Sequence, residues 1–363
     1  MVAGRHRTLL PHALALLYGL AIIFASLQPF TPWIAPEPGT PFWPFAPWPP
    51  RWTRFDVIAN VVAYMPFGAF VALGPRRATP RARAALALAA GLTMSFALET
   101  LQMFLPSRDA SLIDLAANTT GAVLGGFVGA SLVRAERTRH ALSAARHRIF
   151  LGGKLGDFGL ALLVLWLVAQ INPGIPLFAV TFDAEQVQGA ALVHGITAPD
   201  IAATLIEAAV STLQMVGIGL FLALLLRERR FIGGAVLLLI GAALLAKGIA
   251  AMMILKPAVW ETWVRPGVSF GMAGGLLVLL FAIFLPRPVQ VATCATALLA
   301  SLLLPLLAVD APSARAPLTL FNWRYGHLLN FNGLTQTVLL VWPIAAAAWL
   351  FALAGRPAWG EPE

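Results

Sequence analysis

Charged residues are scarce in this sequence, and cysteine is almost absent. Charged side chains make up 11% of the 363 residues, and Cys294 is the single cysteine. One cysteine excludes an intramolecular disulfide and a zinc site built from several thiolates. The hydrophobic fraction of 59% and the mean hydropathy of +0.80 exceed what a soluble core can hide, so the composition indicates a membrane protein.

Common catalytic signatures are also missing. The sequence contains no GxSxG, no HExxH and no Walker-type loop, and its histidines show no metal-ligand spacing. These absences argue against the usual hydrolases, metalloproteases and ATPases, and we predict no cofactor and no metal site. Whether the chain is an enzyme is left open, because membrane enzymes often lack the signatures of soluble ones.

Apolar runs long enough to cross a bilayer follow one another along the chain. A helix needs about 20 apolar residues to span the hydrocarbon. Breaks at Pro, Gly and charged residues predict an all-α, polytopic integral membrane protein with about ten transmembrane helices. The expected spans are 9–28, 56–74, 84–105, 112–133, 155–172, 200–226, 231–255, 267–285, 289–309 and 334–354. The lipid bilayer is therefore the first partner that the sequence predicts.

The basic residues predict the orientation of these spans. Counted over alternate loops, 17 of the 25 Lys and Arg residues fall on one side and seven on the other, with Lys247 inside a span. Cytoplasmic loops are enriched in Lys and Arg, so both termini are predicted in the cytoplasm, with the chain in the cytoplasmic (inner) membrane. Since the charge lies in short loops, the net charge of +9 does not indicate nucleic acid.

A basic stretch divides the spans into two groups. We predict a four-helix transmembrane unit at 1–135, a basic cytoplasmic connector at 136–154 and a multi-span unit at 155–363. The role of the C-terminal group of six spans cannot be deduced from its residues.

Polar side chains gather near one end of the second, third and fourth expected spans and in the turn between the last two. They recur at spacings of three and four, which places them on single helix faces. A charged group inside a span costs roughly 2.5–3.5 kcal/mol on insertion scales, so each needs a partner or a function. The candidate ligand-binding residues are Asp56, Asn60, Ser95, Glu99, Gln102, Arg108, Asp114 and Asn118.

Two further patterns belong to the fourth span. Ser111 followed by Asp114 fits the outline of an N-terminal capping box. Gly121 and Gly125 form a GxxxG pair, which predicts close approach of a neighbouring helix.

The polar positions carry a family resemblance. Over about residues 10–135 the chain resembles VanZ-like membrane proteins in the order Asp56, Asn60, Pro66-Phe67-Gly68, Ser95, Glu99, Gln102, Pro106, Arg108, Asp114, Asn118, Gly121 and Gly125. The resemblance implies a bacterial membrane protein of the cell envelope, and one family member is linked to low-level resistance to the glycopeptide antibiotic teicoplanin. It implies no known reaction, and it does not extend to the C-terminal part.

Two interpretations of the polar set fit the sequence. The side chains either bond across helices and fix the packing, or form an outward-facing pocket for a lipid-linked or glycan envelope molecule. A membrane enzyme acting on a lipid-linked glycan, with Glu99 or Asp114 as general base, and a transporter are the alternative functions.

A second pair of charges lies in the C-terminal spans. Glu207 and Lys247 are each about eight residues from the outer end of their span, hence roughly 12 Å deep. Equal depth predicts a structural ion pair between them.

Overall fold

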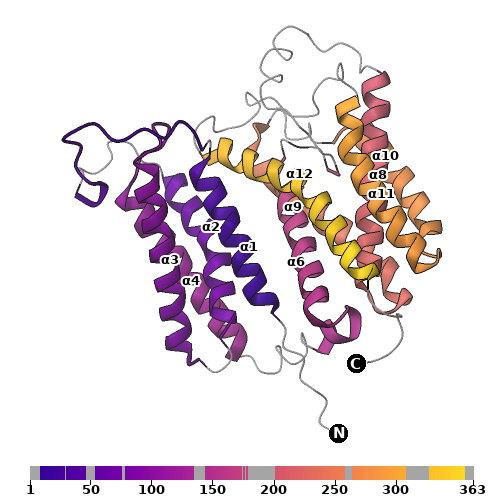
Figure 1. The fold of residues 1–363 in the computed structure, drawn as a ribbon, viewed down its shortest axis with the longest axis horizontal. Coiled ribbons are helices and arrows are strands. Elements are labelled where there is room, and N and C mark those ends of the chain that lie inside the picture. The colour runs from indigo at the N-terminus through magenta and orange to yellow at the C-terminus, as the bar shows by residue number, and fades with distance from the viewer. Residues whose placement is uncertain are drawn as a thin grey trace. The chain divides into compact units, whose positions relative to one another are not determined.

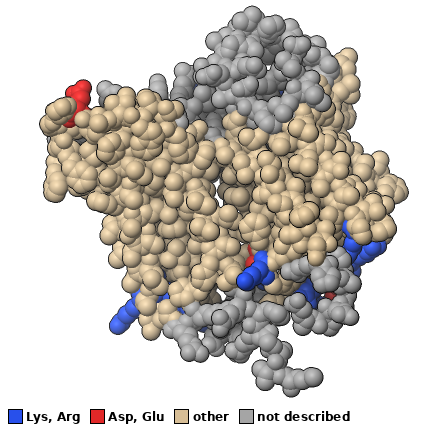
Figure 2. All heavy atoms as spheres, in the orientation of Figure 1, with Lys and Arg blue, Asp and Glu red and all other residues tan. Residues whose placement is uncertain are grey.

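A computed structural model describes residues 9–28, 30–45, 54–75, 78–134, 144–173, 175, 177–178, 201–257, 264–307 and 327–355. The chain is all-helical, and eight of the described helices are long and apolar enough to cross a membrane. On the face drawn in Figure 2, Lys, Arg, Asp and Glu occupy only small patches between uncharged side chains. These features make the protein a multi-pass membrane protein, as predicted.

The described residues form two compact units, 1–148 and 149–363. The boundary between them falls inside the segment 136–154. Unit 1 contains four helices that lie side by side in Figure 1: α1 (Leu10–Leu27), α2 (Arg54–Leu73), α3 (Pro80–Gln102) and α4 (Leu112–Arg134). A short 3₁₀ turn, η1 (Trp43–Phe45), lies in the connection between α1 and α2.

Glycines bring α4 against α2 and α3. A Cβ atom added at Gly121 or Gly125 would overlap backbone carbonyls of α2, those of Val61 and Met65. On the other side of the contact, a Cβ at Gly68 would overlap the carbonyl of Ala122. The close helix approach predicted from the GxxxG pair is therefore confirmed, and it places the polar faces of α2, α3 and α4 next to each other.

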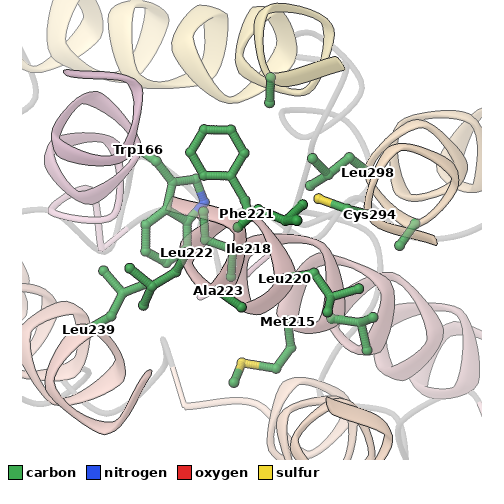
Figure 3. Close-up of a cluster of buried hydrophobic side chains, with 14 of the residues drawn as sticks. Trp166, Met215, Ile218, Leu220, Phe221, Leu222, Ala223, Leu239, Cys294 and Leu298 are labelled. Atoms are coloured by element: carbon green, nitrogen blue, oxygen red, sulfur yellow. The ribbon is translucent and has the colours of Figure 1, made fainter. Parts of the chain in front are cut away.

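Unit 2 is built around α8 (Ile201–Leu225). Five more helices surround or extend this centre: α6 (Gly153–Ala169), α9 (Ile232–Ile254), α10 (Pro266–Ala282), α11 (Arg287–Leu307) and α12 (His327–Ala354), with the 3₁₀ turn η2 (Arg229–Phe231) before α9. Because α8 is apolar on nearly every side, it is buried along most of its length. Figure 3 shows its residues Ile218, Phe221 and Leu222 in one apolar cluster with Trp166 of α6 and Leu298 of α11.

All ten expected spans correspond to helices, although α6 and α10 contain only 17 residues each. Two starts differ from expectation. The third span begins at Pro80 rather than 84, because Thr79 accepts the N–H of Ala82 as an N-cap and proline suits the first helical position. The last begins at His327 rather than 334, because its polar first residues are helical too.

Candidate functional site

Glu99 is buried near the end of α3, and its carboxylate is held by the residue that precedes α4. The Ser111 amide donates a hydrogen bond of 2.7 Å to Glu99 Oε2, and Glu99 is only 3% exposed. Asp114 and Arg108 lie close enough for their charges to act on Glu99.

The start of α4 follows half of the predicted capping box. The Ser111 hydroxyl accepts the backbone N–H of Ile113 at 3.1 Å, which satisfies one of the free donors of the first turn. In a complete capping box the Ser111 N–H would donate to the side chain of Asp114. Here it donates to Glu99 instead. Asp114 is therefore available to another helix.

Two side-chain amides join α4 to its neighbours. Asn60 Nδ2 on α2 donates to Asp114 Oδ1 at 2.7 Å. Asn118 Nδ2 on α4 donates to Ser95 Oγ on α3 at 3.0 Å, and both of these residues are buried. Asp114 and Asn118 are four residues apart, so the two bonds lie on successive turns of α4.

Tyr64 belongs to the same group, although sequence reasoning did not include it. It lies four residues after Asn60 on α2, and its side chain interacts with Ser95, Glu99 and Asp114. Its hydroxyl is buried and makes no hydrogen bond of normal geometry, and Asn118 Oδ1 is likewise unpartnered. The sequence pattern that could have revealed Tyr64 is the recurrence of Asp56, Asn60 and Tyr64 at intervals of four residues. We call Asn60, Tyr64, Ser95, Glu99, Asp114 and Asn118 the polar cluster.

Gln102 and Arg108 point to α1 instead. Gln102 Nε2 donates to the Ser26 carbonyl at 2.8 Å. Arg108 Nη2 donates to the carbonyls of Gln28 at 2.8 Å and Ala25 at 3.1 Å, and Nε donates to Gln28 as well. These bonds satisfy carbonyls at the end of α1, where a helix lacks its own donors. Burial lowers the pKa of the Arg108 guanidinium, and the charge of Glu99 acts in the opposite direction.

Asp56 is the acidic candidate on α2. It is half-buried in the first turn of α2, one turn before Asn60. An acidic side chain in this position interacts favourably with the helix dipole.

Part of the α1–α2 connection lies against the end of α3. Trp43 is buried, and its indole N–H donates to Thr100 Oγ1 at 3.1 Å. The ring also contacts Phe96, with centroids 5.3 Å apart, and the Ile34 amide donates to the Phe104 carbonyl at 2.9 Å. Ile34 and Trp43 thereby attach this connection to the end of α3 that carries Glu99.

The charges of unit 2 do not pair as predicted. Glu207 Oε1 lies 3.0 Å from Arg265 Nε, just before α10. Lys247 Nζ donates to the backbone carbonyls of Asn172 at 2.7 Å and Ile175 at 2.6 Å. The expected ion pair between Glu207 and Lys247 is therefore absent. Equal depth in the membrane could not show that Glu207 pairs with the arginine that precedes α10 and not with the lysine on α9.

Over the part of the chain that the structure describes, no group of three or more His, Cys, Asp and Glu side chains is arranged to hold an ion. The carboxylates of the polar cluster are instead surrounded by amide and hydroxyl groups.

Comparison with known proteins identifies the N-terminal part. The family model VanZ/LLP1 matches residues 9–133, which include α1 to α3 and nearly all of α4. No curated protein and no solved structure shows significant similarity to the chain. The N-terminal third of the chain is therefore VanZ-like, and the remaining residues lie outside the family match.

Proposed function

We propose that the VanZ-like unit binds the polar headgroup of an envelope molecule, a lipid-linked or free glycan, and that this binding contributes to the response to cell-wall and glycopeptide antibiotics. The unit acts from the cytoplasmic membrane, with both termini in the cytoplasm and the polar cluster near the outer surface. The excess of Lys and Arg in alternate loops supports this orientation.

The observation that carries the proposal is the set of polar atoms left over in the polar cluster. After the internal hydrogen bonds are made, the Tyr64 hydroxyl and Asn118 Oδ1 are buried and make no hydrogen bond of normal geometry with the described residues. A packing network alone gains nothing from unsatisfied buried groups, which cost about 1–3 kcal/mol each. A bound ligand supplies the missing partners.

The chemistry of the polar cluster favours hydroxyl groups over phosphate. Glu99 and Asp114 bring two carboxylates, whereas Arg108 gives its hydrogen bonds to carbonyls of α1. Sugar hydroxyls can donate to carboxylate and amide oxygens and can also accept from Tyr64. A phosphate would face repulsion from the same carboxylates.

Access to the polar cluster requires movement of the turn that precedes α4. Glu99 is 3% exposed and Asn118 6%, so a ligand reaches them only when the Ser111 amide leaves Glu99. A glycan hydroxyl then replaces that amide as the donor to the carboxylate.

Binding of a labelled lipid-linked glycan to purified protein in nanodiscs tests the proposal. Tyr64→Phe removes a hydroxyl that makes no hydrogen bond of normal geometry with the described residues, so we expect an affinity about 5–10-fold lower with little change in stability. Glu99→Gln, nearly the same in shape, should lose more and should abolish any antibiotic phenotype in cells. Glu37→Gln, the same change at an exposed acid in the α1–α2 connection, serves as the control. If both cluster variants bind as the wild type does, the proposal is wrong.

One observation favours a second candidate, a membrane enzyme acting on a lipid-linked glycan. The carboxylates of Glu99 and Asp114 come from different helices and interact electrostatically. Two such groups can divide the roles of general acid and general base. Turnover of a labelled lipid-linked precursor by the purified protein, lost in Asp114→Asn, would establish this activity.

A further inference from the structure

The connection between α1 and α2 exposes large apolar side chains. The structure describes its residues 30–45, in which Glu37 is the single charged residue. Phe45 is the most exposed aromatic side chain of this stretch, at 82%. The other large apolar side chains exposed here are Phe30, Trp33, Ile34 and Phe42. Apolar surface left in water forgoes about 25 cal/mol of burial free energy for each Å², so a solvent other than water suits this stretch.

Residues 42–45, which we call the aromatic turn, are fixed against the side of α3. The indole N–H of Trp43 donates to Thr100 Oγ1 at 3.1 Å, and Trp43 is 3% exposed. The rings of Trp43 and Phe42 both contact Phe96, with centroids 5.3 and 6.4 Å from its own. Figure 1 shows the indigo connection at the same end of unit 1 as the last turns of α3. The aromatic turn therefore has a defined place along this helix.

Phe96 places the aromatic turn beside α3 rather than beyond its end. α3 is a candidate membrane span of 23 residues, which gives a length of about 34 Å against a hydrocarbon layer of about 30 Å. Phe96 precedes Gln102, the last residue of α3, by six residues or about 9 Å along the axis. Its side chain leans further towards the start of the helix. The rings that contact Phe96 thus lie at the edge of the hydrocarbon layer.

The aromatic turn continues an exposed apolar face of α3. Leu88, Leu92 and Phe96 recur every four residues on one side of the helix, and their side chains are 42–43% exposed. An exposed apolar face on a membrane-spanning helix suits lipid. Phe42 packs its ring on Phe96 and is itself 41% exposed, and Phe45 follows in the same short turn. The surface that faces lipid on α3 therefore extends onto the turn.

The backbone of the connection has few N–H groups that lipid would leave without partners. Five of the residues 30–45 are proline, which has no N–H. The Phe45 N–H donates to the Phe42 carbonyl at 2.8 Å, and the Ile34 N–H donates to the Phe104 carbonyl at 2.9 Å. An irregular backbone is tolerated at membrane depth only where such groups are satisfied. This backbone suits the boundary between headgroups and acyl chains, where water reaches the remaining groups.

We propose that the aromatic turn inserts into the lipid bilayer beside α3, at the boundary between phospholipid headgroups and acyl chains. Tryptophan is enriched at this boundary, and phenylalanine gains from contact with the acyl chains. The partner of this surface is phospholipid, and a second copy of the chain is the competing partner that the experiment distinguishes. The inference is independent of the glycan binding proposed for the polar cluster.

Spin labelling of the full-length protein in phosphatidylcholine nanodiscs tests the insertion. Cys294 is 0% exposed, so Cys294→Ala gives a background in which one new cysteine carries the nitroxide. Collisions with oxygen, which concentrates in the bilayer, and with a water-soluble nickel chelate together give the depth of the label. We expect the label on Phe45→Cys about 5–10 Å below the boundary, a depth typical of interfacial elements.

Two labels in the same unit are the matched controls. The label on Glu37→Cys, at an exposed acid of the same connection, should collide mainly with the nickel chelate. The label on Leu92→Cys, on the exposed face of α3, should collide mainly with oxygen. Phe45 is 82% exposed, so its replacement should leave the fold intact.

Either of two results would overturn the insertion. One is a label on Phe45→Cys that is as accessible to the nickel chelate as the label on Glu37→Cys, which would place the turn in water. The other is a label on Phe45→Cys shielded from both reagents, which would place protein on the turn. Broadening of that spectrum by a second nitroxide would identify the protein as a second copy of the chain.

Discussion

Asn60 on α2 donates a hydrogen bond of 2.7 Å to the carboxylate of Asp114 on α4, across a helix pair that glycines bring together. The bond links the two helices where the polar cluster lies. Asp114 also has other interactions, so the loss of Asn60 does not leave it unpartnered.

Replacement of Asn60 by leucine should destabilise unit 1. We expect a loss of about 1–3 kcal/mol in the free energy of unfolding, because a half-buried carboxylate loses one of its donors. Denaturant titration of the purified protein in detergent measures this change. The double variant Asn60→Leu with Asp114→Leu should be more stable than the sum of the single changes, and strict additivity of the three variants would show that the bond contributes nothing.

Because α2 and α4 pack closely at Gly125, an alanine there should reduce stability much more than an alanine at a glycine in open space. Gly125→Ala places a Cβ against the carbonyl of Met65 and 2.9 Å from the amide nitrogen of Ala69, so we expect a loss of about 1–3 kcal/mol. Gly241→Ala on α9 meets nothing within 4 Å and should be neutral or stabilising by up to about 1 kcal/mol, as alanine favours a helix. Denaturation of both variants under one condition checks the comparison.

The helices could be predicted from the sequence because a bilayer imposes a length on them. Runs of about 20 apolar residues, ended by proline, glycine or charge, locate most helix ends to within a few residues. The start of α12 was missed because His327, Asn330 and Asn332 are polar but still helical. The close approach at Gly121 and Gly125 was also predictable, since small residues four apart remove the side chains that keep helices separate.

The partners of individual side chains were not predictable in the same way. The sequence spacing shows on which face of its own helix Asn60 or Asp114 lies. It does not show which face of a neighbouring helix packs against that face. Glu207 and Lys247 have the same depth, yet Arg265 reaches Glu207 because Gly267 and Gly271 allow α10 to pack against α8. Backbone partners, such as the carbonyls that hold Lys247, leave no trace in the sequence at all.

Arg108 should fix the end of α1 through the geometry of its guanidinium rather than through charge alone. Nε and Nη2 donate to the carbonyls of Ala25 and Gln28 in a forked arrangement that a lysine ammonium cannot reproduce. We expect Arg108→Lys to increase amide hydrogen exchange over the last turn of α1, and Arg108→Ala to increase it further. Exchange of α6 in unit 2 is the internal reference. Unchanged protection in Arg108→Ala would mean that these bonds do not hold the helix end.

Double-mutant cycles should separate the partner that Glu207 has from the one that its depth suggested. Glu207→Gln and Arg265→Met remove the two members of an ion pair 3.0 Å apart, so their effects on stability should be coupled by at least about 0.5 kcal/mol. The matched cycle of Glu207→Gln with Lys247→Met should be additive within about 0.5 kcal/mol, because the ammonium of Lys247 is held by carbonyls after α6. Coupling in the second cycle and not in the first would restore the pairing of Glu207 with Lys247 that the sequence predicts.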